Sequence, residues 1–205
     1  MPANIIPATW CDPRQDRGAE RRVFETLADQ LNHTYTIFHD RAWVGDRPSR
    51  RAHFIQCDFI ICQEDLGIIV LEVKGGKRIR CRDGRWSGQR HDGGWFSYDL
   101  PPHQQAYEAA FSLRNTMKDA TGDQFPNFVI AHAVCFPNAD VEPADLDRTL
   151  DRAIIIDRRD MSNLEAALLH ARDYWRKEHV LRRASRAAWL PATAVDQIWH
   201  QLARH

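Results

Sequence analysis

Two acidic residues and a lysine interrupt two apolar segments of the chain. Asp58 lies within residues 54–62, and Glu72 and Lys74 lie within residues 68–74. Both segments alternate as β-strands do, and the short connection between them ends in glycine, which predicts a hairpin. The residues that share strand faces with these charges are apolar: Phe54, Ile60, Cys62, Ile68 and Val70. In a hairpin, Asp58 and Glu72 can therefore point to the same side at neighbouring positions.

Two carboxylates held together in a half-buried place repel each other and lose hydration. They stay ionised only beside a cation, and a hard ion that prefers oxygen ligands, such as Mg²⁺, is the usual solution. The carbonyl of Val73 is a plausible further oxygen ligand. Lys74, roughly 7 Å beyond Glu72 on the same face, can balance the acids and hold a water for attack on a phosphodiester. The alternative interpretation is a structural ion pair on a solvated sheet face.

Two predicted helices each carry a polar residue on an apolar face. Glu20 lies within residues 16–31, with apolar residues three, four and seven positions later. Gln105 lies in the first turn of a helix predicted over residues 103–118, above small and apolar residues of the next turns. Both side chains are therefore expected to face inward, with Gln104 as the alternative to Gln105.

A strongly basic segment begins at Lys74. Residues 74–90 contain seven basic residues and one acid. Basic side chains with aromatic rings nearby are typical of a nucleic-acid groove, whereas a solvated edge is the alternative. The residues expected to contact phosphates are Lys77, Arg78, Arg80, Arg82 and Arg85. The aromatic residues are Trp86, Trp95 and Phe96, and core packing is the alternative role for the two tryptophans.

The composition limits the classes of protein that the chain can represent. Its 205 residues include 28 Lys and Arg and 28 Asp and Glu, a formal net charge of zero, which excludes an indiscriminate polyanion binder. The five cysteines form no C-x-x-C pair, so a disulfide framework and a zinc site are not expected. His132 is expected to be a core or edge histidine rather than a ligand. No apolar run is long enough for a membrane helix and no signal peptide is recognisable, so we expect a cytoplasmic protein without a membrane partner.

The remaining patterns predict an α/β fold with a mixed sheet. Strands are expected at residues 35–40, 54–62, 68–74, 128–136 and 153–157, and helices at residues 16–31, 103–118 and 162–177. Residues 77–82 and 85–87 flank Asp83-Gly84, a pair that favours a type I′ hairpin turn. The polar residues 41–53 are predicted to form a loop.

The chain is expected to divide into three parts. Residues 1–15 are an irregular lead-in, and residues 16–178 form the main domain. Residues 179–205 are a basic linker and a C-terminal helix, which would suit a connection into a further domain of a longer protein. Within the main domain, the last helix is predicted to start with a capping box at Ser162.

The chain resembles the nuclease-related domain (NERD) family of the PD-(D/E)XK nuclease superfamily. The resemblance rests on an ordered set of residues on the expected elements: Glu20, Asp58, Glu72-Val73-Lys74-Gly75 and Gln105. It spans about residues 18–118 and continues in element order to about residue 177. It implies a restriction-endonuclease-like core, which is a central mixed β-sheet flanked by helices in αβββαβ order. Cys57 stands where the superfamily name has proline.

The resemblance also implies the roles of the site residues. Asp58 and Glu72 would hold Mg²⁺ or Mn²⁺, Lys74 would be the catalytic lysine, and Glu20 and Gln105 would assist. We therefore predict a metal-dependent nuclease that hydrolyses DNA, with RNA left open as a substrate. Family members are often fused to helicases, which implies DNA processing or repair beside a helicase, although no helicase motif follows here. The alternative is a catalytically silent module of the same fold that binds nucleic acid or protein.

Overall fold

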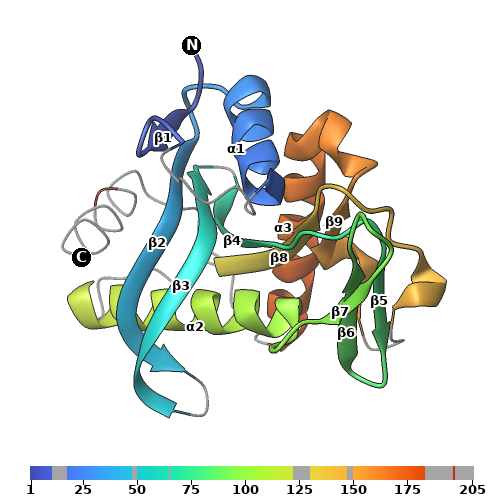
Figure 1. The fold of residues 1–205 in the computed structure, drawn as a ribbon. Coiled ribbons are helices and arrows are strands. Elements are labelled where there is room, and N and C mark those ends of the chain that lie inside the picture. The colour runs from blue at the N-terminus through green and yellow to red at the C-terminus, as the bar shows by residue number, and fades with distance from the viewer. Residues whose placement is uncertain are drawn as a thin grey trace.

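The computed structural model describes residues 1–10, 18–47, 50–64, 66–121, 130–146, 150–182 and 196. Within these residues, the centre of the fold is a six-stranded sheet in the order β1-β2-β3-β4-β8-β9 (Figure 1). Its strands are β1 Asn4–Ile6, β2 Thr36–Arg47, β3 Arg50–Gln63, β4 Gly67–Val73, β8 Ile130–Phe136 and β9 Ile155–Asp157. β3 pairs antiparallel with both β2 and β4, whereas β1 with β2, β4 with β8, and β8 with β9 pair parallel. The sheet is therefore mixed, which confirms the predicted fold class.

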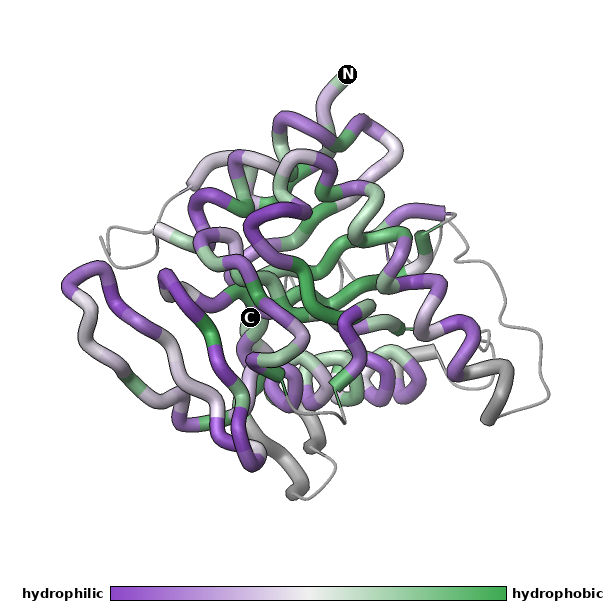
Figure 2. The backbone as a smooth tube through the Cα atoms, turned by 90° about the vertical axis from the view of Figure 1, so that its right-hand side faces the viewer, coloured by the Kyte–Doolittle hydropathy of each residue, from purple (hydrophilic) through white to green (hydrophobic). Residues whose placement is uncertain are grey.

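Helices cover both faces of the sheet (Figure 1). α1 (Gly18–Gln30) and α3 (Leu164–Arg182) pack on one face, where Leu27 and Leu168 belong to one buried cluster with the strands. α2 (Pro102–Thr121) covers the other face, where Leu113 packs with Val70 of β4. Figure 2 shows the hydrophobic segments running through the middle of the molecule, between these helices. β4 is buried along its whole length, as a central strand with two covered faces should be.

A second sheet of three strands lies beside the first: β5 Ile79–Arg82, β6 Arg85–Gln89 and β7 Trp95–Ser97, paired antiparallel in that order. The turn between β5 and β6 has positive φ at both central residues, 50° at Asp83 and 72° at Gly84. This is the requirement of a type I′ turn, and it confirms the predicted hairpin. Trp86 fixes the small sheet to the main core, because it stacks on Phe136 of β8 with ring centroids 5.7 Å apart.

The predicted loop over residues 41–53 is wrong, because β2 continues to Arg47 and β3 begins at Arg50. This extension packs on α2 through Trp43, whose Nε1 donates a hydrogen bond to Ser112 Oγ at 2.9 Å. At the start of the extension, Trp43 is 2% exposed and its neighbour Val44 is 60% exposed, so the two side chains lie on opposite faces of β2.

The ends of the chain also differ from the prediction. β1 lies within the expected irregular lead-in and adds an edge strand parallel to β2. Asn163, and not Ser162, caps α3, because its Oδ1 accepts from Ala166 N at 3.2 Å, while Leu164 N donates to Gln30 Oε1 at 2.7 Å. α3 extends to Arg182, beyond the predicted end. α3 thus includes the start of the predicted basic linker, and the predicted C-terminal helix, apart from residue 196, lies outside the described residues.

The connections contain short 3₁₀ helices, η2 Pro143–Asp145, η3 Arg152–Ile154 and η4 Asp160–Asn163. η3 takes up the first residues of the strand predicted over residues 153–157, so β9 is shorter than expected.

Candidate active site

The site lies where β3 and β4 separate. Their ladder runs from the pair Gln63 and Gly67 to the pair Phe59 and Leu71, and ends there. Beyond this point β3 stays paired with β2, and β4 stays paired with β8 up to Val73 and Cys135. The Asp58 carboxylate takes the place of the next ladder bond, because its Oδ2 accepts from Val73 N at 2.7 Å. The aspartate thus bridges two strands as they diverge.

The alternation of buried residues changes phase at Asp58. Cys57 packs with the cluster under α2, whereas Phe59, two residues later, packs with the cluster under α1 and α3. The facing residue on β2 is also irregular, since Asp40 has a φ of 49° and is skipped in the register. The prediction that Phe54 shares the buried face of Ile60 is consequently wrong, and Phe54 is 65% exposed.

Glu72 and Lys74 form a close ion pair at the end of β4. Lys74 Nζ donates to Glu72 Oε1 at 2.5 Å, with side chains 23% and 7% exposed. Burial raises the pKa of Glu72 to about 8, with help from the charges of Asp58 and Glu20 and against the opposing effect of Lys74. Burial by itself would lower the pKa of Lys74, but the charges of Glu72, Asp58 and Glu20 outweigh it and raise that pKa. The site therefore has an excess of negative charge that one lysine does not cancel.

Glu20 joins this group from the first turn of α1. Its side chain is half-buried, and its charge acts on both Glu72 and Lys74. Four residues that the sequence singles out, Glu20, Asp58, Glu72 and Lys74, thus lie within electrostatic reach of one another. The reason is that α1 packs near the end of β4, where Ala19 lies beside Gly75 and belongs to the same buried cluster as Val73.

Gln105 lies one turn into α2 and is half-buried. Its Oε1 is a buried oxygen without a hydrogen-bond donor among the described residues. Gln104 beside it is exposed, and its amide donates to Glu108 Oε1 at 3.0 Å. Gln105 is thus the inward-facing member of the pair, although no contact with Asp58, Glu72 or Lys74 is found in the described structure.

The donor set suits a hard divalent cation better than a soft one. In the part of the chain that the structure describes, no three His, Cys, Asp or Glu side chains are arranged to hold a metal ion. Mg²⁺ does not need such a set, since it keeps several waters and is commonly held by one or two carboxylates. Val73 directs its N–H toward β3, and in an extended strand the carbonyl of the same residue points to the same side. Asp58, Glu72 and the Val73 carbonyl thus supply oxygen donors of the kind that Mg²⁺ or Mn²⁺ prefers.

The cysteines take no part in this set. The described cysteines are free and buried: Cys57, Cys62, Cys81 and Cys135. Burial and the neighbouring Asp58 and Glu72 carboxylates raise the pKa of Cys57 well above its ordinary value, so it is a protonated thiol beside the site. Cys11 lies outside the described residues.

The basic segment forms or flanks the small sheet. Lys77, Arg78, Arg82 and Arg85 are exposed, and Arg80 is half-buried, with Nε 3.6 Å from Asp145 Oδ1. Trp86 is 2% exposed and belongs to the core, which is the alternative role that the sequence left open. Trp95 is 41% exposed, so it is the accessible tryptophan of this sheet.

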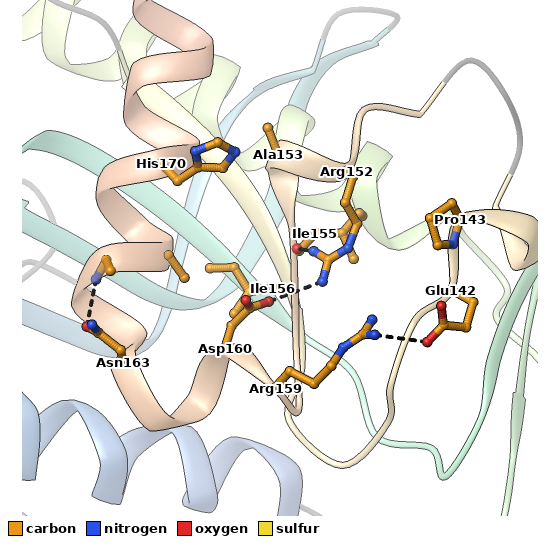
Figure 3. Close-up of a pocket in the computed structure, with 12 residues that line it drawn as sticks. Glu142, Pro143, Arg152, Ala153, Ile155, Ile156, Arg159, Asp160, Asn163 and His170 are labelled. Carbon is orange, nitrogen blue, oxygen red and sulfur yellow. Dashed lines mark hydrogen bonds and ion pairs between the residues drawn. The ribbon is translucent and has the colours of Figure 1, made fainter.

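A cavity of about 720 Å³ lies elsewhere, between β9, η4 and α3 (Figure 3). Its two arginines already have partners: Arg159 donates to Glu142 Oε1 at 2.9 Å, and Arg152 donates to the buried Asp157 at 2.8 Å. Burial favours a raised pKa for Asp157, but hydrogen bonds from Arg159 and from backbone N–H groups, with the charge of Arg152, hold it below the ordinary value. This ion cluster was not predicted from the sequence. The local indication of the cluster in the sequence is Asp157, an acid at the end of an apolar strand.

A mixed sheet flanked by helices, with acids and a lysine where two central strands part, is a restriction-endonuclease-like core. The nuclease-related domain (NERD) family model matches residues 15–137, which is more than half of the chain. The chain therefore belongs to the nuclease-related domain family. The comparison with curated proteins found no match. No described helix is both long enough and apolar enough to cross a membrane.

Proposed function

We propose that this nuclease-related domain is a metal-dependent nuclease that hydrolyses phosphodiester bonds of DNA. One observation carries the proposal: the Asp58 carboxylate accepts from Val73 N where β3 and β4 separate, and its charge acts on Glu72, whose carboxylate lies 2.5 Å from the Lys74 ammonium. A buried carboxylate whose pKa is raised to about 8 beside a second carboxylate is costly for the fold, and such groups concentrate at functional sites.

Asp58 and Glu72, with the Val73 carbonyl, are the groups that would hold Mg²⁺ or Mn²⁺. When bound, the ion would activate a water as nucleophile and neutralise negative charge that develops on the phosphate. Asp58 is restrained for this role by its hydrogen bond with Val73 N, so one of its oxygens has a fixed direction. The Glu72 carboxylate is restrained in the same way by Lys74.

Lys74 and two helix residues complete the proposed site. The Lys74 ammonium is partly exposed, so it can donate to a water or to a phosphate oxygen while it remains on Glu72. Glu20 adds negative charge from α1, which favours both a cation and a protonated Lys74. Gln105 offers a buried amide oxygen that has no donor in the described structure, which suits a hydrogen bond to water.

The exposed basic side chains near the site and the fusions found in the family support DNA as the substrate. The exposed side chains of Lys77, Arg78, Arg82 and Arg85 follow closely after Lys74 in the chain. Lys and Arg side chains bind nucleic acid mainly through the phosphates, without regard to sequence. The frequent fusion of family members to helicases supports a place in DNA processing or repair, beside a helicase in the same or a neighbouring polypeptide.

The test is a nicking assay on supercoiled plasmid and on single-stranded DNA with Mg²⁺, with Mn²⁺ or with EDTA. We expect cleavage with either metal and none in EDTA. Lys74→Ala should reduce the rate by about 100-fold or more, as loss of a positioned proton-transfer or charge-stabilising group does. Lys118→Ala, at an exposed position of α2, is the matched control and should cleave as the wild type does. Unchanged cleavage by Lys74→Ala would disprove the mechanism.

A silent binding module is the second candidate, and the close Glu72–Lys74 ion pair favours it, because such a pair also serves structure alone. For this alternative we expect filter binding of DNA that requires Arg82 and Arg85, tolerates Glu72→Gln, and shows no cleavage with any divalent metal. Cleavage that is lost in Glu72→Gln while binding persists would favour the nuclease.

A further inference from the structure

The small sheet has one buried face and one exposed face. Register places Ile79, Cys81 and Trp86 on the same side, and all three are buried against the core. The opposite side carries the alternate residues of the three strands: Arg80, Arg82, Arg85, Ser87, Gln89, Trp95 and Ser97. We call this side the outer face. It contains three arginines and an aromatic ring, and the strands contribute no carboxylate to it.

Trp95 is the feature of the outer face that needs an explanation. Its indole is 41% exposed, although a tryptophan at the edge of a sheet could instead be buried or replaced by a polar residue. The Arg80 guanidinium lies over its ring, 4.5 Å from the centroid. Asp145 of η2 contacts the same guanidinium at 3.6 Å and so helps to hold it. The indole is therefore fixed from the sheet side while part of it stays accessible.

A flat basic surface with an exposed indole fits unpaired bases better than a duplex. In a duplex the base faces are stacked on one another, so an aromatic side chain outside the helix gains little from them. In a single strand each base has an accessible face, and stacking on an aromatic ring binds it with little regard to sequence. Arg82 and Arg85 lie on the same face and can contact the phosphates on either side of a stacked base.

We infer that the outer face of the β5–β6–β7 sheet binds single-stranded DNA, with one base stacked on Trp95. This inference rests on the proposed nuclease function, since it names the form of the substrate. A hydrogen bond also connects the end of the small sheet to the neighbourhood of Lys74. Tyr98, which follows β7, donates from its hydroxyl to the Gly75 carbonyl at 2.6 Å, next to Lys74.

The connection between the two sheets is short and fixed. Lys77 N donates to Gln89 O at 2.7 Å, and Gln89 N donates to Arg78 O at 2.9 Å, so the chain is bonded to β6 from three residues after Lys74. Arg80 is the sixth residue after Lys74, which limits the distance between their Cα atoms to about 20 Å. A strand held on the outer face therefore lies within a few nucleotides of the catalytic residues.

The experiment measures binding without cleavage. Fluorescence anisotropy in EDTA compares a labelled single strand of about 16 nucleotides, the upper end of known site sizes, with the duplex of the same sequence. We expect the wild type to prefer the single strand. Trp95→Ala should weaken single-strand binding by about 5- to 150-fold, the range for one lost base stack, and should change duplex binding by less than about 2-fold. Trp95→Phe should restore most of the affinity, because it keeps a ring.

Tyr107→Ala is the matched control, because Tyr107 is an exposed ring of similar accessibility, 44%, on α2 and outside the small sheet. It should bind both DNAs as the wild type does. Unchanged single-strand binding by Trp95→Ala, or an equal loss for single strand and duplex, would overturn the inference. Circular dichroism melting curves of each variant show whether the fold is retained.

The two proposals can fail separately. Wild-type cleavage that depends on Lys74, with single-strand binding that does not depend on Trp95, would overturn the outer-face inference and leave the nuclease standing. Trp95-dependent binding of single strands, with no cleavage under any metal, would support the outer-face inference and overturn the proposed nuclease activity.

Discussion

The backbone N–H of Val73 donates to the Asp58 carboxylate at 2.7 Å, at the point where β3 and β4 stop pairing with each other. One aspartate thus satisfies a buried backbone donor of the neighbouring strand and contributes a charge to the candidate site. These two roles can be separated by substitution, because an amide can replace the first role but not the second.

We expect Asp58→Ala to lower the free energy of unfolding by about 1–3 kcal/mol, because it leaves the Val73 N–H without an acceptor in a buried strand. Asp58→Asn should be less destabilised, because its side-chain oxygen can still accept. Both variants should lose cleavage, since neither supplies a carboxylate. Urea unfolding curves measure the first effect and the nicking assay the second. Equal stability of the Ala and Asn variants would show that the hydrogen bond contributes nothing.

A divalent cation should stabilise the folded protein. The negative charge around Glu72 exceeds what Lys74 cancels, so a cation bound in the folded state lowers its free energy. At a Mg²⁺ concentration of about 100 times Kd, we expect the free energy of unfolding to rise by about 2.7 kcal/mol. Thermal and urea unfolding with Mg²⁺ or EDTA provide the measurement.

Asp58→Asn and Glu72→Gln should not gain this stabilisation. Asp173→Asn should keep it, because Asp173 is 61% exposed on α3 and contacts Arg172 rather than the site. If the two site variants gained as much as the wild type, the cation would have to bind elsewhere.

The strands that carry the three charges can be predicted from the sequence, because alternating apolar residues define both of them. If the two segments form a hairpin, alternation over residues 54–62 and 68–74 predicts that Asp58 and Glu72 can point to the same side at neighbouring positions. The same rule fails at Phe54, because the buried face changes at Asp58. The buried face changes where β3 diverges from β4. The pattern of apolar residues along one strand does not show where that strand separates from its neighbour.

Contacts between distant segments explain the other differences. Trp43 extends the β2–β3 hairpin by packing on α2, and its hydrogen-bond partner Ser112 lies 69 residues away in the chain. Asp157 is held by Arg152 and Arg159 nearby, but also by Val141 N at 3.1 Å across a loop. Such partners depend on the finished packing, so the sequence indicates the strand and its terminal acid without indicating the ion cluster.

His132 should make the stability of the fold sensitive to mild acid. Burial, with a smaller effect of His103, lowers its pKa to about 3, against about 6.5 in an unfolded chain. Between these values the unfolded chain binds more protons, so the free energy of unfolding falls as pH falls. From pH 7 to pH 5 this one group should cost up to about 2 kcal/mol.

The measurement is urea unfolding of the wild type and His132→Phe at both pH values. The variant should lose less stability than the wild type over this interval, because it has no group to protonate at this position. Replacement of the exposed His91 by Asn should leave the pH dependence of the wild type unchanged. A wild type and a His132→Phe variant with parallel pH profiles would contradict the prediction.

Replacement by alanine should lower the free energy of unfolding much more at Trp86 than at Trp95, because the two residues lie on opposite faces of the small sheet. Trp86 is 2% exposed and stacks on Phe136, so Trp86→Ala should cost about 3–5 kcal/mol of unfolding free energy, as large cavities in a core do. Trp95→Ala should change stability much less, by about 1 kcal/mol or less, because Trp95 is 41% exposed and lies outside the buried clusters. Urea unfolding of the two variants gives both values.

Measuring both stability and single-strand affinity in these two variants also tests the assignment of the outer face to DNA. A tryptophan that serves packing should affect stability, and a tryptophan that binds a base should affect affinity. The Trp95→Ala variant should keep the stability of the wild type and lose affinity for single-stranded DNA. The Trp86→Ala variant should be less stable, but its folded molecules still carry Trp95 and the arginines of the outer face. These molecules should therefore keep their affinity for single-stranded DNA. If Trp95→Ala destabilised the protein as much as Trp86→Ala, both rings would serve packing. The exposed indole would then be a part of the core and not a surface for a base.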